Sequence, residues 1–230
     1  MIRAVLFDLY YTLLYDTRTG TREKAIERAA AAGIPEEAWL RGWRAAGDRA
    51  ARGELATTRA RVCAALALTG NDGRDDCLID DLTGLLLARQ APRLYPDTRR
   101  TLAEVRRRGY PIGLVSNLFA NEAEWLHEFE LDGAFDCLVL SCEVGVMKPD
   151  PAAYLMAADR LGVRPQECVF VDDIPRFLEG AKAVGMTTVR ISRFGSEEPY
   201  AEHGETETEP DLVIGELKEL LEWLPAEAVR

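Results

Sequence analysis

The stretch RAVLFDLYYTLL, residues 3–14, decides the fold expected for this chain. It opens with a short apolar run, which is typical of a strand buried on both of its faces. The run ends at Asp8, and a carboxylate at the end of a buried strand is costly unless it has partners or a function. Asp8 is therefore a candidate functional residue, and a tyrosine, Tyr10, follows it two positions later.

The chain from Tyr95 onward alternates between helical patterns and short apolar runs. Strands are expected at PIGLVS (111–116), CLVLS (137–141), CVFVD (168–172) and TTVRI (187–191), each preceded by a helical segment. This alternation predicts an α/β fold, a Rossmann-like, doubly wound parallel sheet with right-handed crossovers. The acidic stretch 195–211 is expected to be a solvated loop before a last helix at 217–223.

Residues 20–93 carry four helical patterns and no convincing strand. The expected apolar stripes are Ile26, Ala30 and Gly33; Trp39, Trp43, Ala46 and Ala50; Val62, Leu66 and Thr69; and Leu78, Leu82, Leu85 and Arg89. Such a segment predicts a small helical bundle inserted after the first strand. We therefore expect a Rossmann-like core formed by residues 1–14 and 96–230, with a helical insert at 15–95.

Composition and charge exclude several classes of function. Of the 230 residues, 47% are hydrophobic and 29% charged, and the net charge is −11. Nucleic-acid binding is not expected, because phosphate backbones favour clustered Lys and Arg. We also expect no membrane association, since no run approaches about 18 apolar residues.

The opening residues do not resemble a signal peptide. The chain has five cysteines, an odd number, and none of them form a CxxC pair. Buried free thiols in a reducing cytoplasm are therefore expected. The two histidines, His127 and His203, are expected at the surface.

Polar side chains follow four of the predicted strands at the point where each ends. They are Asp8, Tyr10 and Thr12; Ser116 and Asn117; Lys148 after a loop; and Asp172 and Asp173. Ligands bind at the carboxyl ends of the strands in open parallel sheets, so these groups should converge on one crevice. Three carboxylates there would repel one another unless a cation lies among them, and oxygen ligands suit Mg²⁺.

These segments resemble the motifs of the haloacid dehalogenase-like (HAD) hydrolase superfamily. The matching pieces are FDLYYTLL (7–14), VSN (115–117), GVMKPDPAAY (145–154), and VDD with GAKAVGM (171–173 and 180–186). They occur in the family's order, and the helical stretch 15–95 falls where that family inserts a four-helix cap. The resemblance covers essentially the whole chain and implies a catalytic core with a helical cap domain.

The resemblance also implies a role for each matching residue. Asp8 would be the nucleophile and a metal ligand, while Ser116 and Asn117 would bind the transferred group of the substrate. Lys148 would neutralise the anionic substrate and the nucleophile. The implied Mg²⁺ ligands are Asp8, Asp173, the backbone carbonyl of Tyr10 and, as a secondary or water-bridged ligand, Asp172.

Three positions depart from the family pattern. Family phosphatases usually carry a second aspartate at the position of Tyr10, where it protonates the leaving oxygen, whereas 2-haloacid dehalogenases typically carry tyrosine. A glycine is usual at Tyr11, which implies a bulkier loop here. Phe177 stands where an Asp or Asn often supports the metal.

Two adjacent acids, Asp172 and Asp173, favour the phosphatase over the dehalogenase, because without a metal they would repel both Asp8 and an anionic substrate. The expected function is a Mg²⁺-dependent phosphohydrolase that acts on a small phosphorylated metabolite through an aspartyl phosphate on Asp8. A 2-haloacid dehalogenase is the alternative, since halide leaves without a proton, and a catalytically weak binding protein is a third class. Candidates for holding a substrate anion are Arg18, Arg41 and Arg44, and hinges are expected near Tyr15 and Tyr95.

Overall fold

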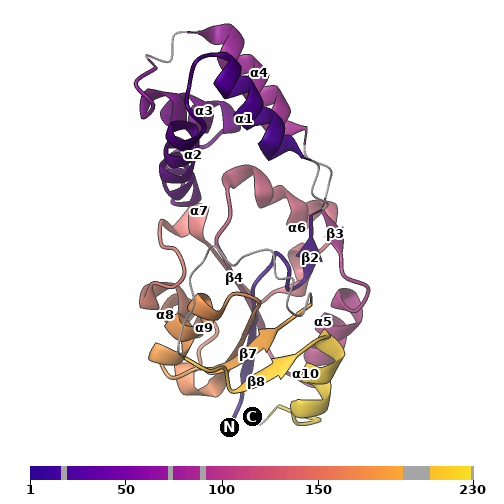
Figure 1. Ribbon diagram of the computed structural model, residues 1–230. Coiled ribbons are helices and arrows are strands. Elements are labelled where there is room, and N and C mark those ends of the chain that lie inside the picture. The colour runs from indigo at the N-terminus through magenta and orange to yellow at the C-terminus, as the bar shows by residue number, and fades with distance from the viewer. Residues whose placement is uncertain (17–19, 72–74, 89–91, 194–207, 229–230) are drawn as a thin grey trace.

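The apolar run after Arg3 forms strand β1 (Ala4–Phe7), which lies inside a six-stranded sheet with the order β5-β4-β1-β6-β7-β8. The computed structural model describes residues 1–16, 20–71, 75–88, 92–193 and 208–228. The other strands of the sheet are β4 (Ile112–Ser116), β5 (Cys137–Leu140), β6 (Cys168–Asp172), β7 (Thr187–Ile191) and β8 (Leu212–Ile214). Each neighbouring pair runs parallel, which confirms the predicted doubly wound architecture (Figure 1).

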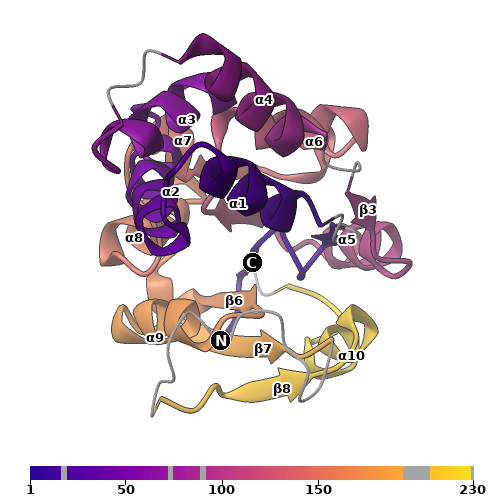
Figure 2. The same cartoon turned by 45° about the horizontal axis from the view of Figure 1, so that its top comes forward.

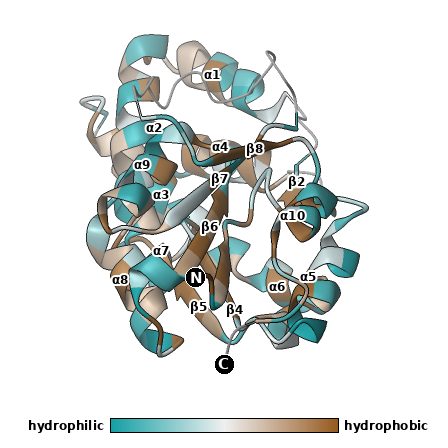
Figure 3. Cartoon of the chain, turned by 90° about the horizontal axis from the view of Figure 1, so that it is seen from below, coloured by the Kyte–Doolittle hydropathy of each residue, from teal (hydrophilic) through white to brown (hydrophobic). Residues whose placement is uncertain are grey.

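Helices cover both faces of the sheet, because alternate residues of each strand point to opposite sides. Val5 and Phe7 of β1 belong to one hydrophobic cluster, and Ala4 and Leu6 belong to another. Helices α5 (Thr98–Arg107), α6 (Glu124–Glu128) and α10 (Leu217–Trp223) pack on the first cluster, and α8 (Pro151–Arg160) and α9 (Pro175–Ala183) on the second. Short helical turns are α7 (Ser141–Val144), η1 (Ala120–Glu122), η2 (Asp132–Ala134) and η3 (Pro165–Glu167). Figure 3 shows the apolar strands enclosed between these helices.

The segment after β1 forms a separate four-helix body. Its helices are α1 (Thr21–Ala31), α2 (Glu36–Ala51), α3 (Thr58–Ala67) and α4 (Asp76–Leu87). They enclose a hydrophobic cluster of their own, and Figure 1 shows them on one side of the sheet, beyond its strand ends. We call α1–α4 the helical insert.

One predicted stripe of the insert is wrong by one position. Ala25 and Ala29 face the core of the insert, whereas Ile26 is half-buried and Ala30 is exposed. Small alanines let α1 pack closely against α4, and Gly33 lies beyond the helix in a left-handed conformation (φ 81°), where it ends the turn. The predicted stripes of α2 and α3 are largely confirmed, since their residues are buried or half-buried. Arg89 lies outside the described residues.

Two short strands connect the insert to the sheet. β2 (Leu14–Tyr15) and β3 (Arg93–Leu94) pair in antiparallel register, with Leu14 opposite Leu94. The rings of Tyr15 and Tyr95 lie 4.8 Å apart, and the Arg193 guanidinium lies 3.7 Å from the Tyr95 ring. Sequence reasoning missed both strands, because two residues are too few for an alternating pattern. We call this paired connection the stem.

The turn after α2 touches the sheet side of the molecule at Gly53. A Cβ atom at this position would lie 2.2 Å from the carbonyl oxygen of Cys142 in α7, which is closer than any real contact. Gly53 also has φ 79°, so glycine is required by both space and conformation. Figure 2 shows α2 and α7 close together.

The remaining differences from expectation are local. The structure adds β8 after the acidic stretch, of which residues 194–207 lie outside the described part. Only Cys137 and Cys168 are buried thiols, whereas Cys77 is exposed, because it lies on the solvent side of α4. His127 is exposed, as predicted, and His203 lies outside the described residues. Among the described residues, none of the helices has the length and apolar character needed to cross a bilayer.

Candidate active site

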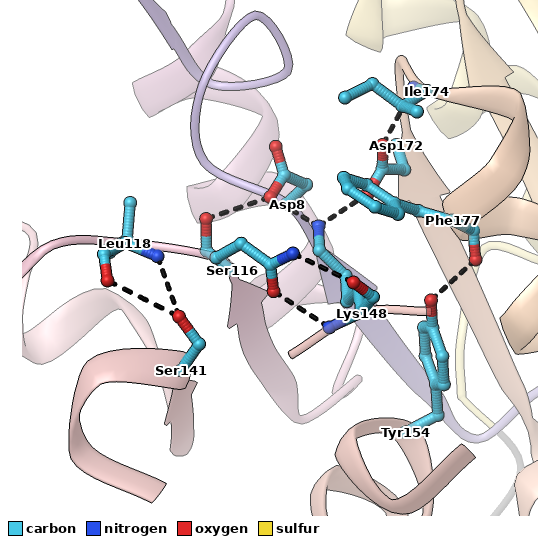
Figure 4. Close-up of polar contacts among 10 residues, drawn as sticks. Asp8, Ser116, Leu118, Ser141, Lys148, Tyr154, Asp172, Ile174 and Phe177 are labelled. Atoms are coloured by element: carbon cyan, nitrogen blue, oxygen red, sulfur yellow. Dashed lines mark hydrogen bonds and ion pairs between the residues drawn. The ribbon is translucent and has the colours of Figure 1, made fainter. Parts of the chain in front are cut away.

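The carboxyl ends of three neighbouring strands bring the predicted site residues together. Asp8 directly follows β1, Ser116 is the last residue of β4, and Asp172 is the last residue of β6. Parallel strands end at the same edge of the sheet, so the three side chains meet there (Figure 4). Lys148 reaches the same point from the loop between α7 and α8.

Lys148 is the cation at the centre of this group. Its Nζ donates to Asp8 Oδ1 and to Asp172 Oδ2, both at 2.6 Å. Lys148 is only 3% exposed and Asp172 is fully buried, so both ion pairs are shielded from water. Charge-assisted hydrogen bonds in such surroundings are short and strong.

Ser116 and Asn117 hold this arrangement from the end of β4. Ser116 Oγ donates to Asp8 Oδ1 at 2.9 Å. The side-chain amide of Asn117 donates to the Lys148 carbonyl at 3.0 Å and accepts from the Lys148 backbone N–H at 2.8 Å. Asn117 therefore fixes the backbone of Lys148, while Ser116 orients the carboxylate of Asp8.

Burial and charge shift the pKa values of the buried groups. Burial alone would lower the pKa of Lys148, but the carboxylates of Asp172 and Asp8 hold it above its ordinary value. Burial raises the pKa of Asp172, against the attraction of Lys148. The pKa of Asp173 is raised well above its ordinary value, first by burial and then by the negative charges of Asp172 and Asp8. The single positive charge of Lys148 thus balances only part of the negative charge of the three carboxylates.

The donor set fits a hard divalent cation. Asp8, Asp172 and Asp173 each offer a carboxylate oxygen, and these oxygens lie within 4.8 Å of one another. Among the described residues, Asp173 Oδ1 is a buried oxygen without a hydrogen-bond partner. Asp173 lines the cavity described below, whereas Asp172 is held behind it by Lys148 and by the Ile174 N–H (2.8 Å). An all-oxygen cluster with one buried, unsatisfied carboxylate oxygen is the kind of site that binds Mg²⁺.

Phe177 packs against the lysine. Its ring centroid lies 4.8 Å from Lys148 Nζ, within the range of a cation–π contact. Its carbonyl oxygen accepts from Tyr154 Oη at 2.6 Å (Figure 4). The ring therefore covers the ion pairs of Lys148, and it offers no metal ligand at the position where the resemblance implied an Asp or Asn.

The loop after Asp8 turns sharply at Tyr11. Tyr11 has φ 58°, a left-handed conformation that costs a non-glycine residue about 1–3 kcal/mol. Its hydroxyl donates a short hydrogen bond to Asp16, and its N–H donates to the Leu14 carbonyl at 2.5 Å. These contacts hold the conformation in which a glycine was expected. Tyr10 and Tyr11 both line the cavity.

A cavity of about 690 Å³ separates this edge of the sheet from the helical insert. Asp8, Ser116, Asn117, Lys148 and Asp173 line it from the sheet side. The insert contributes Arg44 and Asp48 of α2, Arg52 directly after that helix, and Arg61 of α3. This volume is suited to a small molecule.

The three arginines proposed from the sequence have different outcomes. Arg44 lines the cavity, Arg41 is exposed and is not among the described lining residues, and Arg18 lies outside the described part of the chain. Arg52 and Arg61 were missed. The spacing of Arg44, Asp48 and Arg52 by four residues, with mostly small residues between them, was the available signal for one cavity-facing side of α2 and its C-cap.

Comparison with known proteins identifies a single family and two activities within it. Residues 2–185 match the family model of the haloacid dehalogenase-like hydrolases. The chain is 38% identical over 130 residues to a glyceraldehyde 3-phosphate phosphatase of Methanopyrus kandleri, covering 56% of this chain and 55% of the relative. It is 37% identical over 109 residues to (S)-2-haloacid dehalogenase 4A of Burkholderia cepacia, covering 46% of each protein. The crystal structure of a HAD phosphatase from Thermococcus onnurineus superposes with a TM-score of 0.69 at 27% identity, covering 99% of this chain and all of that one.

These similarities do not by themselves separate the two reactions. The chain spans about half the length of the curated relatives that it matches first, and phosphatases and dehalogenases occur among them at nearly equal identity. The choice between the two reactions therefore depends on the chemistry of the site.

Proposed function

The chain belongs to the haloacid dehalogenase-like hydrolases, and we propose that within this family it is a Mg²⁺-dependent phosphohydrolase acting on a small phosphorylated molecule. The observation that carries the proposal is the third carboxylate, Asp173, which is half-buried beside Asp8 and Asp172 and has one buried oxygen without a hydrogen-bond partner in the described structure. Release of halide needs no such group, and the extra negative charge would repel a haloacid carboxylate. A phosphoryl group, by contrast, requires concentrated positive charge around it, to which a metal contributes.

The proposed reaction begins with Asp8. A carboxylate oxygen of Asp8 attacks phosphorus, and the bond from phosphorus to the leaving oxygen breaks, which gives an aspartyl phosphate. Water then attacks the phosphorus, the bond to Asp8 breaks, and phosphate and the free carboxylate result. Ser116 orients Asp8 for the attack through its 2.9 Å hydrogen bond.

Lys148 neutralises the nucleophile and the incoming phosphoryl oxygens, and Asp172 and Asn117 hold it in place. Asp8, Asp173 and the Tyr10 carbonyl would hold Mg²⁺, with Asp172 as a secondary ligand. The bound ion supplies positive charge that lowers repulsion between the carboxylate and the phosphoryl group. The helical insert is proposed to act as a cap over Asp8, with the stem as its hinge.

Removal of the metal is expected to abolish phosphate release. With p-nitrophenyl phosphate as substrate, the wild type should be active in Mg²⁺ and inactive in EDTA. Saturating Mg²⁺ at about 100 times its dissociation constant should also raise the melting temperature by about 5–10 °C, since binding adds about 2.7 kcal/mol to stability. Asp173→Asn should lose both effects, whereas Asp132→Asn, which changes an exposed carboxylate, should keep both.

Halide release is the measurement that separates the alternative. If the enzyme releases chloride from 2-chloropropionate in EDTA and no phosphate in Mg²⁺, it is a dehalogenase, as Tyr10 alone would indicate. A protein that turns over neither compound would be a binding protein of this fold.

Tyr10→Asp is expected to raise the turnover of alkyl phosphates by about 10- to 100-fold. Such leaving groups need a proton, and general acid catalysis contributes about 10²–10⁴ in rate. Tyrosine, with an ordinary pKa of about 10, is a poor acid–base group near neutrality. The gain should be small for p-nitrophenyl phosphate, whose leaving group departs without a proton. Equal changes for both substrates would mean that Tyr10 shapes the cavity instead.

A further inference from the structure

A column of aromatic side chains joins the helical insert to the loop after β4, with an arginine inside it. Trp39 and Trp43 of α2 stack with ring centroids 5.6 Å apart. The guanidinium carbon of Arg61, from α3, lies 3.7 Å from the Trp43 ring and 4.2 Å from the ring of Phe119. Phe119 belongs to the sheet side of the molecule, so Arg61 contacts both parts.

The position of this guanidinium is further fixed by its neighbours on α2. Arg61 Nη2 donates to the Trp43 carbonyl at 3.4 Å. A Cβ atom at Gly47 would lie 2.6 Å from the same nitrogen, so the glycine leaves the space that the guanidinium occupies. Arg61 is half-buried as a result, whereas Arg44 and Arg52 are exposed. An arginine stacked on rings has little rotamer freedom left to lose when it binds a ligand.

The charges on the two walls of the cavity differ. The described lining from the segment between β1 and β3 carries three guanidinium groups, Arg44, Arg52 and Arg61, against the two carboxylates of Asp16 and Asp48. This local excess of positive charge lies in a chain whose net charge is −11. A wall of this sign attracts anions, in addition to the phosphoryl site on the sheet side.

We propose that Arg61 is a specificity residue that binds a second anionic group of the substrate, a carboxylate or a second phosphate, at the end away from the transferring phosphoryl group. The inference rests on the proposed phosphohydrolase function. The planar guanidinium matches either anion with paired N–H donors. Phe119 lies three residues after Ser116, which orients Asp8, so the residue that recognises the far end of the substrate packs on the loop that serves the reacting end.

The test compares matched substrates with and without the second anion. We would measure kcat and KM for para-carboxyphenyl phosphate, its uncharged methyl ester and para-phenylene bisphosphate, and for the flexible pair of 3-phosphooxypropanoate and propyl phosphate. Arg61→Met keeps apolar bulk between the rings and removes the donors. Arg61→Lys keeps the charge without the planar fork. Arg41→Ala is the control, since Arg41 is exposed on α2 and outside the described lining.

Arg61→Met should lower kcat/KM about 10- to 100-fold for substrates with a second anion, mainly through KM. The methyl ester and propyl phosphate should change by less than about twofold, because they carry no second negative charge for the guanidinium to bind. Arg61→Lys should recover part of the loss, and Arg41→Ala should change nothing. Equal losses with and without the second anion would overturn the proposal and leave Arg61 a packing residue, and so would the absence of any loss. Preference for the carboxylate or the bisphosphate identifies which anion is bound.

Binding to an inactive variant separates this inference from the proposed function. In the Asp8→Asn background, calorimetry should give weaker binding of para-carboxyphenyl phosphate after Arg61→Met, with binding of the methyl ester unchanged. If the wild type releases no phosphate from any substrate but this binding difference persists, the phosphohydrolase function fails and the anion site stands. If the wild type releases phosphate but Arg61→Met does not weaken the binding of para-carboxyphenyl phosphate, the phosphohydrolase function stands and the anion site fails.

Discussion

Asp8→Asn should reduce phosphate release from p-nitrophenyl phosphate by at least about 10³-fold, because an amide cannot form the aspartyl phosphate. Asparagine has nearly the shape of aspartate and still offers an oxygen to Ser116, so the fold should be retained. Removal of one of three adjacent carboxylates also relieves repulsion, and the melting temperature in EDTA should not fall. The measurement is steady-state phosphate release, with circular dichroism to verify the fold.

The same variant gives a chemical signature of the intermediate. Wild type quenched with acid during turnover should carry one phosphoryl group that alkaline hydroxylamine removes, and Asp8→Asn should carry none. Asp132→Asn serves as the matched control, since its exposed carboxylate lies outside the site. Activity that survives in Asp8→Asn would assign the nucleophile to another group.

Lys148→Met should destabilise the metal-free protein by about 3–5 kcal/mol, the usual cost of removing one partner of a buried ion pair. Asp8 and Asp172 would both lose their 2.6 Å contact to the ammonium group, and Asp172 is fully buried. Lys182→Met is the control: its pair with Asp211 (3.0 Å) is partly exposed, and loss of such a pair costs less than about 1 kcal/mol. Urea denaturation in EDTA measures both.

Two further measurements identify the cause. Adding Asp172→Asn to Lys148→Met should recover part of the lost stability, because the carboxylate without a partner is then removed. The pKa of Lys148 is raised in the folded protein, so its stabilisation is present below the ordinary pKa of 10.5 and is lost as pH rises through the raised value. Without the ammonium group, the raised pKa values of Asp172 and Asp173 rise further. The difference between wild type and Lys148→Met should therefore grow from neutral pH to about 10, as these carboxyls lose their protons, and shrink only above it, as Lys148 loses its own. A variant as stable as the Lys182→Met control would contradict the ion-pair network.

The convergence of Asp8, Ser116, Lys148 and the two later acids could be predicted from the sequence, because parallel strands place their carboxyl ends at one edge. The order of the strands, the antiparallel stem and β8 could not be predicted in the same way. Pairing within the stem is set by tertiary contacts, such as those of Arg193 with Tyr95 and Asp97, rather than by local periodicity. The left-handed turn at Tyr11 was also hidden, because its stabilising partner Asp16 lies five residues away in the chain.

The cavity wall formed by the insert was the part of the site that was hardest to predict from the sequence. Hydrophobic periodicity reveals the side of α2 that is buried in the insert, which includes Trp39, Ala46 and Ala50. The opposite side, with Arg44, Asp48 and Arg52, has the composition of an ordinary solvated helix face. Only the position of α2 over Asp8 distinguishes the two, and that position depends on contacts between distant segments, such as Gly53 with Cys142.

The stem has a consequence for how such a protein can diversify. Because Leu14 pairs with Leu94, the chain leaves the sheet and returns to it at adjacent points. In the described part of the chain, the hydrophobic clusters on the two faces of the sheet take no residue from α1–α4, which have a cluster of their own. The length of the helical insert and its cavity-facing residues can therefore change in evolution without disturbing the two clusters that support the sheet. The carboxylates and the lysine at the strand ends keep their geometry through such changes.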